Sequence, residues 1–246
     1  MTTDTVPKLV SRTVELSQGS VTVTGIAKGA GMICPDMATM LAYVATDAAV
    51  PQPVLQQMLG DAVEPSFNAI TVDGDTSTND ACVLLASGAS GHRVDTLDSS
   101  DGRRLAQGVG AVCAELAEMI VRDGEGATKL VRIRVESAAD DEEARRVAYT
   151  VAHSPLVKTA FFGEDANWGR IIAAAGRAGV FLDPERLDLY FDDVQMVKNG
   201  TGCGPDAEEK ATGVLGKPEF SVTLDLNRGG GRASRGLGGG ARAGDR

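Results

Sequence analysis

The segment 28–41 combines residue types that can do chemistry with a backbone that can turn sharply. It contains Lys28, two close glycines and a proline, and it places the small pair Ala38-Thr39 just before an apolar run. One interpretation is a flexible loop that leads into a buried strand. A second is self-cleavage, in which the Thr39 hydroxyl attacks the Ala38 carbonyl, the acyl group moves from nitrogen to oxygen, and ester hydrolysis releases a new N-terminus. The freed α-amine, with a pKa of about 7.7 to 8, can then act as base for its own hydroxyl.

Other sources of a general base are few in this sequence. His92 and His153 are the only histidines, and no G-x-S-x-G elbow is present, so a Ser-His-Asp triad has few candidates for its base. We expect both histidines to be structural or surface residues. An enzyme built from this chain therefore takes its base from a carboxylate, a lysine or an exposed α-amine.

Two further motifs suggest a ligand but fail in their details. Acidic and polar residues alternate as in half of a calcium-binding EF-hand loop, at Asp73, Asp75, Ser77 and Asn79. The glycine and the bidentate glutamate that such a loop needs are replaced by Thr78 and Leu84, so we expect an Asx-rich turn. The series Gly200, Gly202 and Gly204 lacks the lysine of a phosphate loop and precedes acidic residues, so we expect a turn there too.

Apolar periodicity predicts the elements that must position these residues. Alternation predicts strands over residues 21–25 and 129–136, and further strands are expected over 187–191 and 219–226. A spacing of three to four predicts helices over residues 53–65 and 103–122, and an acidic start with a stop before Ser154-Pro155 predicts another over 140–153. Strands and helices alternate without regular βαβ units. This indicates an α/β fold of layered, mixed sheets rather than a doubly wound parallel sheet.

The last residues, 228–246, differ in composition from the rest of the chain. They contain eight glycines and five arginines and carry a charge of +4, whereas the preceding residues carry −14. Such a segment cannot bury enough apolar area to offset its chain entropy, so we expect a disordered tail. It has no aromatic side chain to stack on a base, which disfavours RNA as its partner.

Composition excludes several classes of function. The 246-residue chain is 43% hydrophobic, enough to bury a sizeable core, and its net charge of −10 disfavours nucleic acid and anionic membrane surfaces as partners. No apolar run reaches the roughly 20 residues that span a bilayer. Four separated cysteines without a C-x-x-C pair favour buried reduced thiols over a zinc site or a disulfide framework. We expect a soluble cytoplasmic protein that acts on small molecules and holds no metal.

Several longer motifs resemble a single family over residues 1 to about 227. They are MTTDT (1–5), GIAKGAGMI (25–33), MATML (37–41), TDA (46–48), SFNAITVDGDTSTND (66–80), DGEGATK (123–129), SPLVKTA (154–160) and DANWGR (165–170). The chain is similar to the latter part of the ornithine acetyltransferase family, the bifunctional glutamate N-acetyltransferases of arginine biosynthesis.

The resemblance implies roles for individual residues. Thr39 corresponds to the nucleophile that accepts the acetyl group after cleavage between Ala38 and Thr39. Thr5, Lys28 and Glu125 correspond to positions that contact the substrate. Lys28 suits a substrate carboxylate and Glu125 suits an α- or δ-ammonium group, both as charge-assisted contacts to an amino acid. The resemblance also implies a layered α/β sandwich of the type shared with self-cleaving aminopeptidases.

The implied reaction is ping-pong. N-acetylornithine acetylates Thr39, ornithine leaves, and glutamate takes the acetyl group. No cofactor is implied, although acetyl-CoA is a possible acetyl donor, and the cleaved chains are expected to assemble as an α2β2 heterotetramer. On this basis residues 1–38 are the remnant of the α chain, 39–227 the β-chain domain, and 228–246 the tail.

The chain also departs from the family pattern. The family's α chain begins upstream of Met1, in a part that holds the Thr-Gly pair of the oxyanion hole, and loss of such donors lowers rates by about 10² to 10³. After about Ser234 the expected ending, with a substrate-binding Asn and Thr, is replaced by the Gly/Arg tail, and Asp36 stands where asparagine is usual. We therefore expect a truncated or frameshifted gene. Two alternatives stay open: an inactive remnant that serves as an interaction partner, and a related N-terminal-nucleophile aminopeptidase.

Overall fold

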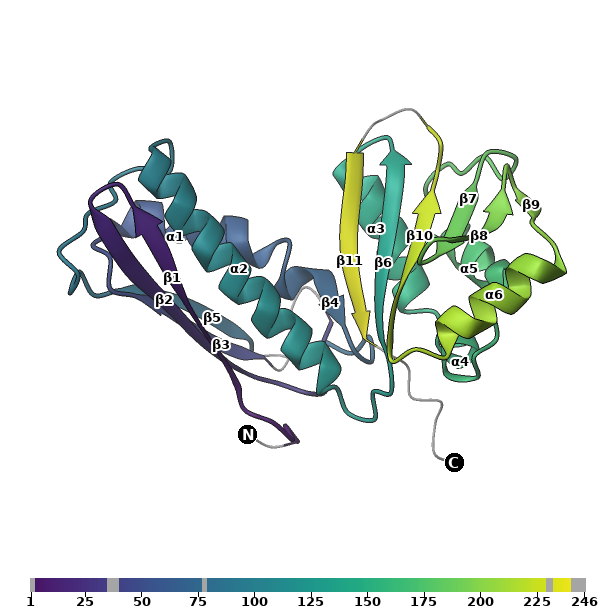
Figure 1. Cartoon of the computed structure of the whole chain (residues 1–246), viewed down its shortest axis with the longest axis horizontal. Helices are drawn as coiled ribbons and strands as arrows, with labels where there is room; N and C mark the ends of the chain where they lie inside the picture. Colours follow the sequence, from purple (N-terminus) through teal and green to yellow (C-terminus); the bar gives the residue numbers. More distant parts are fainter. Residues whose placement is uncertain (1–2, 35–39, 77–78, 229–231, 240–246) are drawn as a thin grey trace. The chain divides into compact units, whose positions relative to one another are not determined.

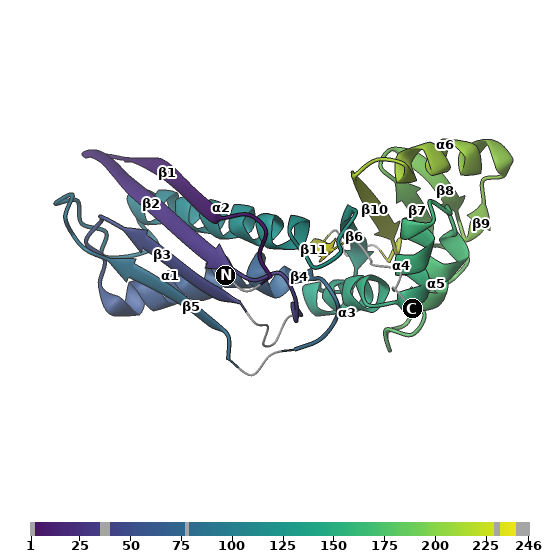
Figure 2. The same cartoon turned by 90° about the horizontal axis from the view of Figure 1, so that it is seen from below.

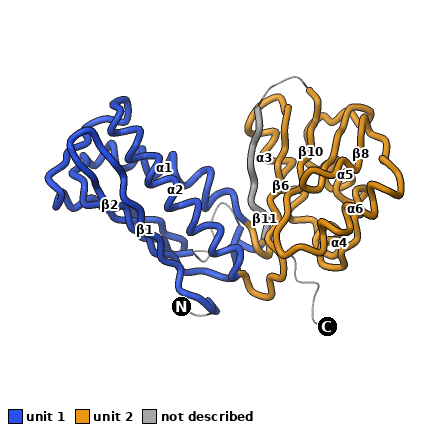
Figure 3. The backbone as a smooth tube through the Cα atoms, in the orientation of Figure 1, with its two compact units in different colours: residues 1–70, 75–123 blue, residues 71–74, 124–246 orange. Residues whose placement is uncertain are grey.

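The chain folds into two compact units, seen in a computed structural model that describes residues 3–34, 40–76, 79–228 and 232–239. Unit 1 comprises residues 1–70 and 75–123, and unit 2 comprises residues 71–74 and 124–246 (Figure 3). The predicted division placed residues 39–227 in a single domain. The structure divides that segment instead, because each unit closes a core around a sheet of its own.

Unit 1 is built on a four-stranded mixed sheet (Figure 1). Its strands lie in the order β1 (Lys8–Leu16), β2 (Gly19–Lys28), β3 (Leu41–Thr46) and β5 (Ala81–Ala86). Strands β1 to β3 are antiparallel, whereas β5 runs parallel to β3. The remaining elements are α1 (Gln52–Val63), the 3₁₀ turn η1 (Phe67–Ala69) and α2 (Ser100–Arg122).

Helix α2 covers one face of this sheet with the apolar stripe that the sequence predicts. Its stripe residues are fully buried: Leu105, Val109, Val112, Leu116 and Ile120. The helix begins three residues before the predicted start, because the Ser99 side chain accepts a hydrogen bond from the Gly102 N–H and caps it. In Figure 2 both α1 and α2 lie behind the four strands.

The opposite face of the unit 1 sheet carries exposed apolar side chains. The strand register aligns Leu9, Ile26 and Tyr43 in one row across β1, β2 and β3. Each of these residues keeps about half or more of its surface exposed. The alternation of buried and exposed positions along β2 and β3 therefore separates a packed face from an apolar but uncovered one.

Unit 2 contains a mixed sheet in the order β4-β11-β6-β10-β7-β8-β9. Its strands are β4 (Ile70–Thr71), β6 (Leu130–Ala138), β7 (Asp188–Phe191), β8 (Val194–Lys198), β9 (Thr201–Gly202), β10 (Glu219–Asp225) and β11 (Arg232–Gly239). Its helices are α3 (Asp141–Ala152), α4 (Pro155–Phe162), α5 (Trp168–Ala175) and α6 (Pro205–Leu215). Strands β6 and β10 are parallel, and the prediction of layered, mixed α/β sheets is confirmed.

The core of unit 2 contains a cluster of three aromatic rings. Phe161 meets Phe220 edge to face with ring centroids 5.4 Å apart, and Phe191 lies 6.5 Å from each of them. Such edge contacts add to the stability that comes from burying the rings. None of the described helices is both long and apolar enough to cross a membrane.

The structure corrects the prediction of a disordered tail over residues 228–246 for the part 232–239; residues 229–231 and 240–246 lie outside the described residues. Residues Arg232–Gly239 form strand β11, which pairs antiparallel with β6. The prediction considered only how much apolar surface the tail could bury. A ladder of backbone hydrogen bonds along the edge of β6 needs no apolar side chains, so this composition does not prevent pairing.

Candidate active site

Unit 1 places Lys28 at the end of the sheet where the predicted cleavage segment enters it. The register pairs Lys28 of β2 with Leu41 of β3, and Leu41 in turn with Ala81 of β5. Strand β3 begins at Leu41, two residues after Thr39. The half-buried Lys28 thus lies beside Leu41, where the chain enters the sheet after the predicted cleavage site.

Ala38 and Thr39 themselves lie outside the described residues, but Met40 is described and is fixed from both sides. Its N–H donates to the Asp80 carboxylate at 2.8 Å, and its carbonyl accepts a hydrogen bond from the Ala81 N–H at 3.1 Å. Burial raises the pKa of Asp80, while the Met40 N–H and the positive charge of Lys28 oppose that rise. Asp80, which sequence reasoning missed as a site residue, therefore anchors the backbone directly after Thr39.

Thr5 lies in unit 1 and is held by Asp123. The Thr5 N–H donates to Oδ2 of Asp123 at 3.0 Å, and the Thr5 hydroxyl donates to Oδ1 of the same carboxylate. Asp123 is the C-cap residue of α2, and it also forms an ion pair of 2.5 Å with Lys8 at the start of β1. The hydrogen bonds from Lys8 and Thr5 outweigh the effect of burial and lower the pKa of Asp123.

Glu125 belongs to unit 2 and is exposed. It lies in a tight turn in which the Ala127 N–H donates to the Gly124 carbonyl at 2.9 Å. Gly126 has a φ of 67°, a conformation that glycine adopts without strain, and this explains the second glycine of the DGEGATK motif. The structure thus gathers Thr5, Lys28 and the anchored Met40 in unit 1 and presents Glu125 on a turn of unit 2.

The second histidine and the two motifs that resemble ligand-binding loops have structural surroundings. His153 is half-buried, with Nε2 3.1 Å from the Thr71 hydroxyl, and the motif that holds Asp73 and Asp75 belongs to no group of metal-ligating side chains among the described residues. Ser77 and Thr78 lie outside the described part of the chain. Gly204 has a φ of 88° and stands at the N-cap of α6, as expected for a turn.

The four cysteines are free thiols, as predicted, but they are not all buried. Burial raises the pKa of Cys82 to about 11 and that of Cys113 to about 12, so both stay protonated at neutral pH. Cys203 is exposed, which corrects the expectation of burial, because it follows the short edge strand β9.

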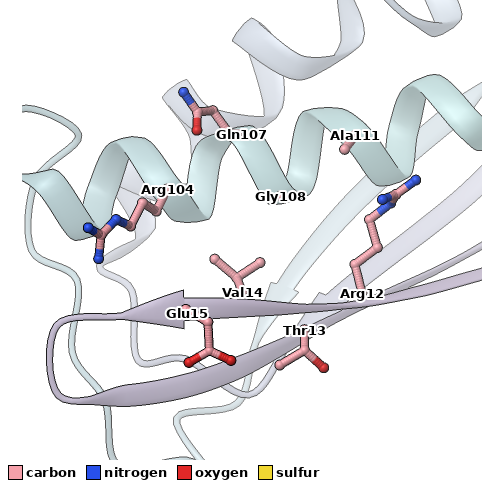
Figure 4. Close-up of a pocket in the computed structure, with 8 residues that line it drawn as sticks. All are labelled: Arg12, Thr13, Val14, Glu15, Arg104, Gln107, Gly108 and Ala111. Atoms are coloured by element: carbon pink, nitrogen blue, oxygen red, sulfur yellow. The ribbon is translucent and has the colours of Figure 1, made fainter.

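An open groove in unit 1 lies between β1 and α2 (Figure 4). It has a volume of about 670 Å³ and is lined by Arg12, Thr13, Val14, Glu15, Arg104, Gln107, Gly108 and Ala111. The groove is on the half of β1 away from Lys8, and its cations are already engaged, Arg12 with Glu115 and Arg104 with Asp101. It therefore does not contribute to the arrangement around Lys28.

Comparison with known proteins identifies the family. The model of the ArgJ family matches residues 1–236 of the chain. The chain belongs to the ArgJ family. ArgJ relatives include two proteins described as arginine biosynthesis bifunctional protein ArgJ. That of Syntrophotalea carbinolica is 57% identical over 94% of this chain and 59% of the relative, and that of Geobacter sulfurreducens is 54% identical over 95% and 60%.

A solved ArgJ structure supports the fold assignment. The crystal structure of the arginine biosynthesis bifunctional protein ArgJ from Bacillus halodurans matches with a TM-score of 0.77 at 38% identity, over 82% of this chain and 94% of that one. The chain spans about three fifths of the length of the curated ArgJ relatives that it matches.

Proposed function

We propose that this chain is a self-processing acetyltransferase that moves an acetyl group from N-acetylornithine to glutamate through an acetylated Thr39. Membership of the ArgJ family supports this proposal. The observation that carries it is the fixed position of Met40. Its backbone is hydrogen-bonded to Asp80 and Ala81, and the next residue, Leu41, pairs with Lys28 in the sheet. An anchored residue directly after the nucleophile limits the orientations that the nucleophile can take.

Processing requires one acyl shift and one hydrolysis. The Thr39 Oγ attacks the carbonyl carbon of Ala38, the C–N bond breaks, and the nitrogen takes up a proton as the ester forms. Water then cleaves the ester, which leaves a carboxylate on Ala38 and a free α-amine and hydroxyl on Thr39. These steps need no cofactor and no nucleophile other than the Thr39 hydroxyl and water.

Acetyl transfer then uses the freed amine as the base. It takes the hydroxyl proton as Oγ attacks the acetyl carbonyl of N-acetylornithine, and the proton passes to the departing ornithine amine. The α-amine of glutamate attacks the acetyl ester in the second half and regenerates the hydroxyl. In this scheme Lys28 pairs with a substrate carboxylate and Glu125 with a substrate ammonium group.

The processed fragments are proposed to stay together as an α2β2 assembly in the cytoplasm. The contact of Lys8 with Asp123 and the pairing of β2 with β3 favour retention of the N-terminal fragment. Size-exclusion chromatography with light scattering of the processed protein measures this directly. Separation of the 1–38 fragment from the remainder would contradict the assembly.

Variants at Thr39 test the chemistry. Thr39→Ala is expected to abolish both cleavage and acetyl transfer because it lacks the hydroxyl, whereas Thr39→Ser keeps part of each. Intact-mass analysis should find fragments 1–38 and 39–246 in the wild type, and incubation with N-acetylornithine should add one acetyl group to the larger fragment. An unprocessed, unmodified wild-type chain would contradict the proposal, and peptide hydrolysis without acetyl transfer would indicate an aminopeptidase instead.

A further inference from the structure

A cluster of three ionised side chains lies in unit 1, next to residues that the proposed function assigns to the substrate. Lys8 Nζ lies 2.7 Å from Asp4 Oδ1 and 2.5 Å from Asp123 Oδ2. The side chains of Lys8, Asp4 and Asp123 are 0%, 1% and 4% exposed. We call these three residues the buried triad.

The buried triad is a costly way to stabilise a core. Removing charges from water carries a penalty that an ion pair offsets only with good geometry, and well-packed apolar side chains often serve stability equally well. Two carboxylates against one ammonium leave an extra negative charge. In addition, Asp4 Oδ2 has no hydrogen-bond partner within the described chain, which adds a further penalty. Stability alone does not explain this arrangement.

The remaining contacts of the buried triad point to the substrate residues. Asp123 accepts hydrogen bonds from both the N–H and the hydroxyl of Thr5. Asp4 Oδ1 accepts a hydrogen bond of 2.8 Å from the N–H of Gly29, the residue after Lys28. Gly29 has a φ of 153°, so the chain turns at this point in a conformation that favours glycine.

Both carboxylates are ionised at neutral pH. Burial raises the pKa of Asp4, but the hydrogen bonds from Lys8 and from the Gly29 N–H outweigh it and set the pKa at about 2. Charged acceptors make shorter and stronger hydrogen bonds than neutral ones. Each carboxylate can therefore hold one ammonium and one backbone N–H in a fixed orientation at the same time.

We infer that Lys8, Asp4 and Asp123 form a positioning triad that fixes Thr5 through Asp123 and the Lys28-Gly29 turn through Asp4. This inference rests on the proposed function for the roles of Thr5 and Lys28. None of the three triad residues has to touch the substrate, because their side chains are enclosed.

The triad also determines what Thr5 can offer to a substrate. The Thr5 hydroxyl has one proton, which it donates to Asp123, so only its oxygen lone pairs remain available. Thr5 therefore accepts a hydrogen bond from an ammonium or amide N–H group of the substrate and does not donate one. A substrate group that presents only acceptors would not bind there.

Two isosteric variants test the triad in a crossed design. Asp123→Asn changes the acceptor that holds Thr5, and Asp4→Asn changes the acceptor that holds Gly29. By hydrogen exchange, we expect the Thr5 amide to exchange about tenfold faster in Asp123→Asn and the Gly29 amide to do so in Asp4→Asn, with the other amide changed much less. Arg12→Met is the control, because it removes an exposed cation from β1, the strand that carries Lys8.

Kinetics separate positioning from a purely structural role. Each triad variant is expected to raise the KM for N-acetylornithine about tenfold with a smaller effect on kcat, while Arg12→Met changes neither. Equal acceleration of exchange at both amides, or an unchanged KM despite the crossed pattern, would overturn the inference. A wild-type protein without acetyl transfer would contradict the proposed function, and the crossed exchange pattern would still decide whether the triad holds the two segments.

Discussion

Unit 1 encloses a lysine between two aspartates, whereas the core of unit 2 is apolar and includes three phenylalanine rings. Lys8 is the only charged residue among those buried as a whole in the described chain, and Asp4 and Asp123 hold its ammonium group. In unit 2 the large side chains Phe191, Leu189 and Met196 are fully buried. Unit 1 therefore adds a cluster of directional charged contacts to its apolar core, whereas these large buried side chains of unit 2 make only non-directional contacts.

This comparison distinguishes side chains that stabilise the fold by packing from side chains that orient the groups to which they are hydrogen-bonded. Apolar packing depends on volume and shape, and it tolerates small shifts of the backbone. Charged hydrogen bonds have preferred directions and fix the groups that they join. Unit 1 contains Lys28, Thr5 and Met40, so the directional interactions occur in the unit that carries most of the candidate site.

The largest expected effects come from replacing one buried side chain in each unit. Lys8→Met leaves two buried carboxylates without their cation and should destabilise unit 1 by about 3–5 kcal/mol. Phe191→Ala leaves a cavity in unit 2 and should cost a similar amount, about 3–5 kcal/mol. Hydrogen exchange resolves the two units separately, because a single melting temperature is not well defined for them. Equal loss of protection in both units after either change would contradict this independence.

A smaller effect is expected at the contact between β2 and α2. A Cβ added at Gly25 would lie 2.6 Å from a Val112 methyl group and 2.7 Å from one of Leu116, so Gly25→Ala should destabilise unit 1 by about 1–3 kcal/mol. Gly60→Ala is the matched control on α1, where the added methyl group meets nothing within 4 Å. That variant should stabilise the helix by about 0.5–1 kcal/mol. Urea unfolding of both variants measures the difference, and a neutral Gly25→Ala would show that α2 can shift.

The two units should respond to acid in different pH windows. Burial and the charge of Lys158 lower the pKa of His153 in the folded protein, so its contribution to unit 2 is present above pH 6.5 and is lost as the pH falls below that value. The pKa of Asp4 is about 2, so its contribution to unit 1 is present above pH 3.8 and is lost only between pH 3.8 and about 2.

Acidification is therefore expected to weaken unit 2 first. The fluorescence of Trp168, the only tryptophan in the sequence, follows unit 2, and hydrogen exchange follows unit 1. His153→Gln should remove the sensitivity near pH 6.5 without changing the behaviour of unit 1 below pH 4. If the amides of unit 1 lost their protection from hydrogen exchange between pH 6 and 5, this would argue against ionised aspartates in the triad.

The smallest effect is expected for an ion pair at the surface of unit 1. Arg12 and Glu115 lie 2.6 Å apart, but their side chains are 48% and 46% exposed. Solvent and salt screen such a pair, so Arg12→Ala should change the free energy of unfolding by no more than about 0.5 kcal/mol. In 1 M salt, the loss of unfolding free energy in Lys8→Met should persist, whereas the unfolding free energy of Arg12→Ala should equal that of the wild type.

Sequence periodicity was sufficient for the long elements and insufficient for the short ones. The stripe of α2 and the alternation of β6 extend over enough residues to be recognised. Helices α4 and α5 have eight residues each, too few to establish a period, and their start signals are a serine and an asparagine cap. Strand β11 depends on backbone pairing with β6, which composition does not reveal.

The candidate site was predicted in part. Thr5, Lys28 and Glu125 follow from family motifs, but the buried triad joins residues up to 119 positions apart, and nothing local in the sequence indicates that pairing. One signal was available. Lys8 occupies an inward position of the alternation that includes Val10, Val14 and Leu16, where a lysine implies a buried partner.

The anchored Met40 has a consequence for the entropy of the reaction. If the chain is cut before Thr39, the new terminus is tethered one residue from a backbone that two hydrogen bonds already hold. A loose end would explore many directions and seldom meet its target, whereas so short a tether confines the attacking oxygen to a small volume from the moment it is released.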